Sequence, residues 1–275
     1  TPGGSAANVA VWARRCGTAV HFVGKIGRDR FGLLAREDLE REGVVHHLVE
    51  TDAHLTGSVA VFVDTTGERS MVSGRGADFF LIPSELPKLV VAGARHLHLT
   101  GWSFFTDPPR SAARTAAELA RRAGATISLD PASFQMIDEM GVPQFLSWVR
   151  DLGVSVFLPN HEEGRILTGL DDPREIAASL AETFPDALVV LKLDAQGALV
   201  LEGGVATEIP PATHTVLDAT GAGDSFAGAF LARWLAGDGA VESARYATRI
   251  AAWVIGHLGA RPAPDERLRS LVAAR

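Results

Sequence analysis

Short apolar strand segments alternate with helical segments along this chain, and that alternation limits the fold more than any other feature. Residues 107–124, for example, open with Asp and Pro, repeat alanine and leucine at helical spacing and end in a glycine. Apolar runs predict strands at 94–101, 125–130, 154–160 and 187–194. Strands that alternate with helices favour a mostly parallel sheet covered on both faces. With 275 residues, 47% of them hydrophobic, the chain suits one large α/β domain, with or without a small appendage.

Two segments are predicted to form β-hairpins. Residues 57–74 (GSVAVFVDTTGERSMVSG) place apolar residues on both sides of a turn near Thr66 and Gly67. This hairpin interrupts the alternation of strands and helices, so it is a candidate lid over one edge of the main sheet. Residues 197–210 form the second predicted hairpin. From Gly223 nearly to the end of the chain, the sequence predicts helices.

Charge and cysteine content argue against several classes of partner. The net charge is −7 and the isoelectric point is near 5.7, with no cluster of Lys and Arg, so nucleic acid and anionic membranes are poor candidates. No apolar run is long enough to span a bilayer, and no signal peptide is evident. The single cysteine, Cys16, favours a reducing compartment and a cytoplasmic location. His46 and His47 fall in a connection and indicate no specific site.

Polar residues stand at the ends of the predicted strands. They are Thr100 with Gly101, Asp130, Asn160, and Lys192 with Asp194. In open α/β sheets, ligands bind outside the carboxyl ends of the strands, so these side chains are expected to line one crevice. Strand ends are also polar simply because they emerge into water. That alternative explains each residue singly better than it explains an Asn, an Asp and a Lys together.

A glycine-rich turn at residues 221–224 is the strongest single candidate for chemistry. Gly221, Ala222 and Gly223 let the backbone approach a ligand closely. If a helix starts here, its free N–H groups form an anion site beside Asp224, which could accept a proton from a hydroxyl. This pairing suits phosphoryl transfer, although the chain contains no P-loop. The alternative is a tightly packed helix start in which Asp224 merely favours the positive helix end.

Two segments carry a family resemblance. Residues 218–230 (DATGAGDSFAGAF) resemble the C-terminal signature of the ribokinase-like, or PfkB-type, carbohydrate kinases, and residues 2–32 resemble the N-terminal signature. The resemblance implies a three-layer α/β/α sandwich with a mostly parallel central sheet and a small β lid, over a single domain 1–275. It also implies a phosphotransferase that uses ATP and Mg²⁺ to phosphorylate a hydroxyl of a small sugar or sugar-like substrate. A nucleoside kinase of the same family and a non-catalytic nucleotide- or sugar-binding protein remain as alternatives.

The same resemblance assigns roles within the glycine-rich turn. Asp224 matches the catalytic base, and the backbone of Gly221, Ala222 and Gly223 matches the hole that holds the transferred phosphate. Asp218 and Thr220 fall where several relatives bind a monovalent cation such as K⁺ near the nucleotide. Gly221 and Gly223, with Thr220, are thereby also nucleotide-binding residues.

Two further segments match family motifs near the phosphates. Asn160 and Glu163 match an N-x-x-E motif that organises Mg²⁺ in relatives, often through water, although Asn followed by Glu three residues later is also a helix capping box. Lys192 and Gly197 match a strand and loop beside the nucleotide. Asp194 stands where relatives have a glycine, and its charge would repel phosphate unless the side chain points away.

The N-terminal turn matches the sugar-contacting segment of the family. Gly3, Gly4, Ser5 and Asn8 are the residues concerned, and the alternative is that Ser5 or Asn8 caps a helix. Gly259, in the segment GARP, matches the loop that closes the adenine pocket.

One departure from the family concerns the first strand. Relatives begin with a strand whose aspartate binds substrate hydroxyls, and nothing here corresponds to it, so we expect that this segment is omitted. Lids of relatives often pair, which makes a homodimer through residues 55–75 plausible.

Overall fold

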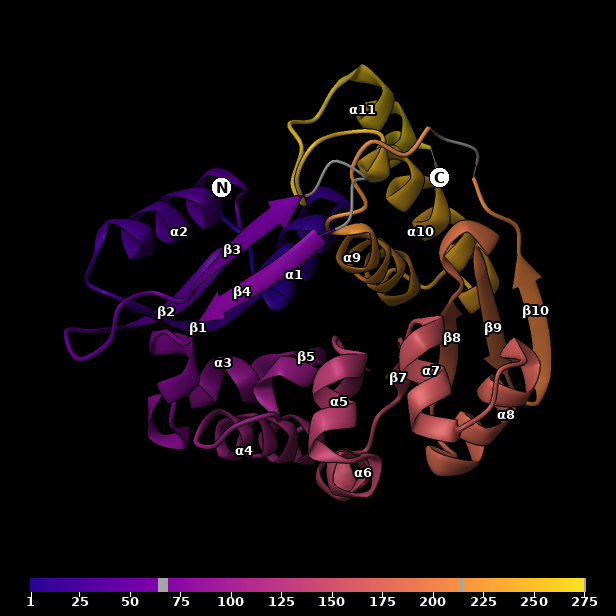
Figure 1. Ribbon diagram of the computed structural model, residues 1–275, viewed down its shortest axis with the longest axis horizontal. Coiled ribbons are helices and arrows are strands. Elements are labelled where there is room, and N and C mark those ends of the chain that lie inside the picture. Colours follow the sequence, from indigo (N-terminus) through magenta and orange to yellow (C-terminus); the bar gives the residue numbers. More distant parts are fainter. Residues whose placement is uncertain (64–68, 213–214, 275) are drawn as a thin grey trace.

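The computed structural model describes residues 1–63, 69–212 and 215–274 (Figure 1). The helices are α1 (Ser5–Arg15), α2 (Arg30–Arg41), α3 (Lys88–Gly93), α4 (Pro109–Arg122), α5 (Phe134–Met140), α6 (Val142–Val149), α7 (His161–Thr168), α8 (Pro173–Thr183), α9 (Ala222–Leu235), α10 (Ala240–Ile255) and α11 (Glu266–Ala273). The strands are β1 (His21–Gly27), β2 (Val45–Thr51), β3 (Ser58–Val63), β4 (Arg69–Gly74), β5 (His96–Thr100), β6 (Thr126–Asp130), β7 (Val156–Phe157), β8 (Leu188–Lys192), β9 (Ala198–Glu202) and β10 (Val205–Ile209).

The main sheet has six strands in the order β10-β9-β8-β7-β6-β5. Strands β5 to β8 are parallel to their neighbours, with pairs such as Leu99 beside Leu129, and each crossover between them contains at least one helix. Strands β9 and β10 are antiparallel and form the hairpin predicted at 197–210. Because parallel strands point the same way, the carboxyl ends of β5, β6, β7 and β8 meet at one edge of the sheet, where the polar residues lie.

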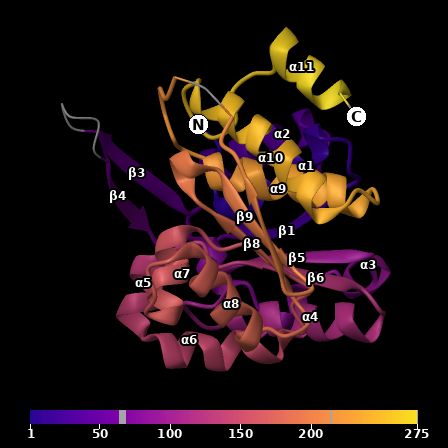
Figure 2. The ribbon, with the colours of Figure 1, turned by 90° about the vertical axis from the view of Figure 1, so that its right-hand side faces the viewer.

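Both faces of this sheet are buried, as the sequence predicts. Along β8, Val189 and Leu191 pack in an apolar cluster with helices α4 to α8. The residues that alternate with them, Leu188 and Val190, pack in a second cluster with α1, α9, α10 and α11. Figure 2 shows these two helical layers on either side of the strands. The period-two alternation of side chains thus confirms the three-layer α/β/α architecture.

A second, two-stranded sheet contains a strand that sequence reasoning missed. Strand β2 (Val45–Thr51) pairs in parallel with β1, so that Phe22 lies beside His46 and Val23 beside His47. The prediction that His46 and His47 belong to a connection is therefore wrong. The segment VHHLVET alternates weakly and is half polar, and only its pairing with β1 and the packing of Leu48 against α1 and α2 make it a strand.

The predicted lid is an antiparallel hairpin. Strand β3 pairs with β4, with Ser58 opposite Gly74 and Ala60 opposite Val72, and Figure 2 shows that the hairpin projects from the body. The turn predicted near Thr66 and Gly67 lies outside the described residues. Val59 and Val72 have 55% and 61% of their surface exposed. The homodimer expected through this lid stays a prediction.

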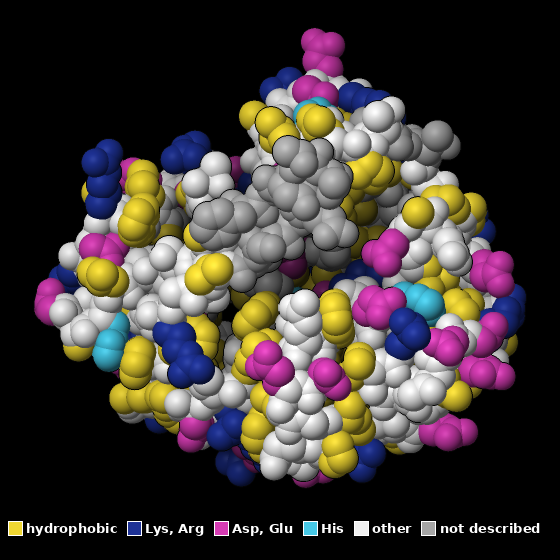
Figure 3. Space-filling view, viewed as in Figure 1, with side chains coloured by type: hydrophobic (Ala, Val, Ile, Leu, Met, Phe, Trp, Pro, Cys, Tyr) yellow, Lys and Arg dark blue, Asp and Glu magenta, His cyan; other side chains and the backbone are white. Residues whose placement is uncertain are grey.

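No helix among the described residues is both long and apolar enough to cross a membrane. The cytoplasmic location stays a prediction, and so does the exclusion of nucleic acid and membrane partners. Figure 3 shows Lys and Arg interspersed with Asp and Glu over one face of the molecule.

Helices α1 and α9 cross at Gly228, and this contact brings the two ends of the chain together. A Cβ atom at Gly228 would lie 2.7 Å from the Cβ of Trp12 and 2.7 Å from the carbonyl oxygen of Val9. Both helices are buried there, so neither neighbour can move easily. Gly228 is therefore needed for the close approach of α1 to α9.

We expect Gly228→Ala to lower the free energy of unfolding by about 1–3 kcal/mol, because the added methyl group forces the two helices apart. Gly93→Ala in α3 is the matched control, since a Cβ there meets nothing within 4 Å. Urea denaturation of the two variants and the wild type measures the effect. Equal stability of the two variants would contradict the assigned contact.

Candidate active site

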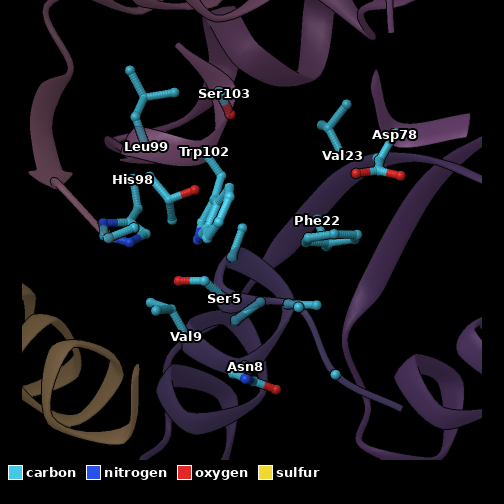
Figure 4. Close-up of a pocket in the computed structure, with 18 of the residues that line it drawn as sticks. Ser5, Asn8, Val9, Phe22, Val23, Asp78, His98, Leu99, Trp102 and Ser103 are labelled. Carbon is cyan, nitrogen blue, oxygen red and sulfur yellow. The ribbon is translucent and has the colours of Figure 1, made fainter. Parts of the chain in front are cut away.

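A cavity of about 2820 Å³ opens beside the carboxyl edge of the main sheet. Pockets for single small ligands usually measure about 300–1,000 Å³, and this larger one also includes the gap between β1 and β5. Its lining includes Gly3, Gly4, Ser5, Asn8, Phe22, Val23, His98, Leu99, Trp102, Asn160, Glu163, Asp218, Thr220, Gly259 and Arg261. Figure 3 shows a hollow near the centre of the face turned to the viewer. Figure 4 shows side chains of α1, β1 and β5 around the cavity.

The cavity also separates two strand edges. Strand β1 pairs with β2 along one edge and β5 pairs with β6 along one edge. Within the described part of the chain the other edges of β1 and β5 have no strand partner, and residues of both strands line the cavity. Whether a further strand belongs between them, as the resemblance implies, stays a prediction.

The glycine-rich turn forms the start of α9, as the sequence predicts. Gly221 precedes the helix with φ 78°, a left-handed conformation that glycine adopts without strain. A Cβ at Gly221 would lie 2.6 Å from the Cβ of Ala260, so the turn packs directly against the 259–262 loop. At Gly223 the nearest atom to an added Cβ would be the Lys192 ammonium nitrogen, at 3.6 Å. The Lys192 ammonium group therefore lies close to the first turn of α9.

Asp224 lies in the first turn of α9 and is held by two side chains of α1. The Ser5 hydroxyl donates to Asp224 Oδ1 at 2.9 Å, and the Asn8 amide Nδ2 donates to Oδ2 at 2.6 Å. Burial raises the pKa of Asp224 above its usual value, and the hydrogen bonds from Asn8 and Ser5 oppose that effect. The N-cap of α1 is Gly4, with no side-chain cap, so the alternative that Ser5 or Asn8 caps this helix is wrong.

Lys192 and Asp130 form a buried ion pair below the turn. Lys192 Nζ lies 2.6 Å from Asp130 Oδ2, and the two residues are 8% and 4% exposed. Although burial acts to lower the pKa of Lys192, that pKa is raised, because the Asp130, Glu163 and Asp224 carboxylates favour the charged form. The structure thus brings together the polar ends of β6 and β8. Their contact places a permanent positive charge next to α9. Of the residues expected to line one crevice, Thr100 and Asn160 line the cavity, whereas Asp130, Lys192 and Asp194 do not.

Asn160 and Glu163 form the capping box of α7, so the helix-cap alternative is confirmed. Asn160 Oδ1 accepts from the Glu163 N–H, and Glu163 Oε2 accepts from the Asn160 N–H, both at 2.8 Å. Burial and the Asp130 carboxylate raise the pKa of Glu163 to about 7. Each of these two side chains still has a further oxygen lone pair to offer.

Asp218 joins two loops through its carboxylate. Oδ1 accepts from the Thr220 N–H and Oδ2 accepts from the Gly259 N–H, both at 2.8 Å. Asp218 therefore ties the segment before α9 to the loop after α10, and Gly259 adopts φ 81° there. The cation role expected for Asp218 and Thr220 stays a prediction.

Two residues near the predicted nucleotide loop are explained by backbone geometry. Asp194 adopts φ 49° and is exposed, which accounts for a glycine at this position in relatives and for a side chain that points to solvent. Gly197 adopts φ 93°, and a Cβ there would collide with the carbonyl oxygen of Ile209. Gly197 is buried and does not line the cavity, so its nucleotide contact stays a prediction.

Sequence reasoning did not assign a role to Arg261, Asp38 or Phe22. Arg261 lies two residues after Gly259, which was assigned to the adenine pocket. The Arg261 side chain contacts Asn8 and Asp38. Phe22 and Trp102 point into the cavity from β1 and from the segment after β5 (Figure 4). No local signal identifies Asp38, because it is a buried acidic residue among the charged residues of α2 and its burial shows only in the fold.

The fold and the site together place the N-terminus of α9 beside the buried Asp224 carboxylate at the carboxyl edge of an α/β sheet. A family model, "pfkB family carbohydrate kinase", matches residues 1–267. The chain belongs to this family, whose members are phosphotransferases that act on sugar hydroxyl groups.

Individual relatives agree with that membership. A fructokinase of Escherichia coli is 34% identical over 239 residues, which cover 84% of this chain and 76% of the relative. An adenosine kinase from Sinorhizobium meliloti superposes with a TM-score of 0.90 at 28% identity, covering 99% of this chain and 81% of its own. A fructokinase from Vibrio cholerae O395, solved with fructose, ADP and calcium, superposes with a TM-score of 0.86 at 26% identity. The match covers 98% of this chain and 91% of the fructokinase. The family match to carbohydrate kinases does not favour the nucleoside kinase alternative.

The raised pKa of Glu163 makes stability depend on pH. Between pH 4.5, its ordinary pKa, and about 7, folded Glu163 keeps a proton that the unfolded chain has released. The free energy of unfolding should therefore fall as the pH rises through this window. Glu163→Gln keeps an acceptor for the Asn160 N–H but has no proton to release. We therefore expect the free energy of unfolding of this variant to fall by about 1–3 kcal/mol less than that of the wild type over the same pH range.

Chemical denaturation at pH 5 and pH 8, without divalent metal, measures this difference. Glu162→Gln, at an exposed neighbouring position in α7, should keep the wild-type pH dependence. Identical pH dependence in wild type and Glu163→Gln would show that Glu163 is ionised throughout.

Proposed function

We propose that this protein transfers the γ-phosphoryl group of ATP to a hydroxyl of a small sugar, with Asp224 as the base. One observation supports this most: the Asp224 carboxylate lies in the first turn of α9 and is bound by Ser5 and Asn8, two residues that line a large cavity. The hydroxyl oxygen forms a bond to phosphorus while the bond to ADP breaks, and the hydroxyl proton goes to Asp224. The N–H groups at 221–224 stabilise the charge on the transferred group.

The sugar is proposed to bind at the N-terminal turn. Gly3 and Gly4 lie at the cavity wall without side chains, and Gly4 has φ 91°, so a polyol can approach the backbone. Ser5 and Asn8 hydrogen-bond to both oxygens of Asp224, which holds the base beside the bound sugar. Fructose is the first candidate, because the related enzymes from Escherichia coli and Vibrio cholerae are fructokinases.

The nucleotide is proposed to lie along α9 and the 259–262 loop. The Lys192 ammonium group faces the turn at Gly223 and would contact the phosphates. Thr220 and Gly259 line the cavity where Asp218 joins the two loops, and Gly221 is the neighbour of Thr220 in the same turn. Gly197 supports the neighbouring hairpin at the same end of the sheet.

The acidic residues near Lys192 fit a magnesium ion held mainly by phosphate and water. Asn160 and Glu163 supply oxygen atoms at the cavity wall, and Mg²⁺ usually takes only one or two carboxylates from a protein. When bound, Mg²⁺ would neutralise charge on the phosphates. For K⁺, we propose the Asp218 carboxylate, whose oxygens also accept the Thr220 and Gly259 N–H groups.

A substrate panel tests the proposed reaction. With ATP and Mg²⁺ supplied, we expect phosphorylation of a sugar among ribose, fructose and 2-keto-3-deoxygluconate, measured by ADP release and by mass spectrometry of the product. Phosphorylation of adenosine or inosine alone would instead favour the nucleoside kinase. Binding of ATP without turnover of any acceptor would favour the non-catalytic alternative.

Replacement of the base gives a sharper test. Asp224→Asn should lower kcat by about 100- to 10,000-fold, the usual contribution of a general base, while the Kd for ATP changes little. Asp172→Asn, which replaces the N-cap of α8 by another good cap, is the matched control and should retain full activity. Wild-type turnover in Asp224→Asn would remove Asp224 from the mechanism.

A further inference from the structure

A chain of four polar side chains runs from helix α2 to Asp224. Arg261 Nη1 is paired with Asp38 Oδ2, and Arg261 Nε donates to Asn8 Oδ1 at 2.7 Å. Asn8 Nδ2 in turn donates to Asp224 Oδ2 at 2.6 Å. Arg261 Nη2 also donates to the Gly3 carbonyl oxygen at 3.0 Å. The side chains of Arg261 and Asp38 are 6% and 9% exposed, so this chain is shielded from water.

The chemistry of its neighbours gives the Asn8 amide one orientation. A guanidinium group can only donate hydrogen bonds, and an ionised carboxylate can only accept them. The amide oxygen of Asn8 must therefore face Arg261, and its NH₂ group must face Asp224. The reversed amide would place NH₂ against guanidinium and oxygen against carboxylate, and both hydrogen bonds would be lost.

We propose that Arg261 and Asp38 are positioning residues, which orient the Asn8 amide so that it donates to the base Asp224. The inference rests on the proposed role of Asp224. It makes the 259–262 loop, which closes the nucleotide side of the cavity, part of the support for the base. Arginine suits this position because its planar fork reaches Asn8, Asp38 and the Gly3 carbonyl at the same time.

The electrostatics of Asp224 make the proposal measurable. The charged groups that face Asp224 are Lys192 from β8, Asp130 from β6 and Arg261 from the loop after α10. The hydrogen bond from Asn8 holds down the pKa of Asp224, which burial raises. Loss of the oriented amide and of the Arg261 charge should therefore raise that pKa further.

The experiment is a ¹³C NMR titration of the Asp224 carboxyl carbon in protein labelled at aspartate, with the signal assigned by its absence in Asp224→Asn. For Arg261→Met we expect the pKa of Asp224 to rise by roughly one unit. Arg15→Met is the matched control. Arg15 is as buried as Arg261 and also binds the 259–262 loop, through the Pro262 carbonyl oxygen, but it contacts neither Asn8 nor Asp224.

Arg261→Lys separates orientation from charge. Lysine keeps the positive charge but cannot reach three acceptors with a fixed fork, so the Asn8 side-chain NH₂ protons should exchange faster with water than in wild type. If Arg261→Met does not fold, this variant alone decides. Wild-type NH₂ exchange in Arg261→Lys, or an equal pKa of Asp224 in Arg261→Met and Arg15→Met, would overturn the proposal.

Activity gives a second reading. With a sugar that the panel shows to be phosphorylated, Arg261→Met should lower kcat by about 10- to 100-fold. It should also move the acidic limb of the pH–activity profile to higher pH, because the pKa of Asp224 rises. A lower kcat with an unmoved limb, matched by Arg15→Met, would show a structural role only and overturn the assignment. The NMR titration needs no substrate, so failure of the sugar panel would count against the proposed function without deciding the positioning role.

Discussion

The hydrogen bond between Asn8 and Asp224 is the contact on which the site depends, because it joins helices that lie 216 residues apart in the chain. It can form only where α1 and α9 approach closely, and Gly228 allows that approach. The same crossing buries Trp12, whose indole N–H donates to the Ala260 carbonyl oxygen. The packing of two helices therefore sets the position of the N-terminal turn, Asp224 and the 259–262 loop together.

The carboxylates around Asp224 outnumber the cations that pair with them, and this excess of negative charge affects the binding of an anionic ligand. The buried carboxylates of Asp130 and Asp38 are each paired with a cation, Lys192 and Arg261 respectively. Asp224 is held by neutral donors, and Glu163 sits close to half protonation at neutral pH. A triphosphate adds further negative charge beside these groups. A divalent cation that arrives with the nucleotide would reduce the repulsion and draw Glu163 towards its ionised form.

The layers of the fold and the start of α9 could be predicted from sequence, since apolar periodicity and glycine-rich turns are local signals. Strand β2 could not, because VHHLVET becomes a strand only through its pairing with β1. The role of the turn at 221–224 came from the family resemblance, and periodicity alone left it undecided. The contact of Arg261 with Asn8 spans 253 residues, so no reading of local pattern could have found it.

The capping box at Asn160 shows why the two interpretations of that motif do not exclude each other. A cap needs one oxygen of Asn160 and one of Glu163, and both hydrogen bonds are to backbone N–H groups at the start of α7. Those bonds restrain the two side chains and leave the second carboxylate oxygen of Glu163 uncommitted to the cap. Local capping therefore prepares two oxygen atoms at the cavity wall before any ligand binds. A motif that stabilises a helix start can for that reason serve a metal–phosphate complex without rearrangement.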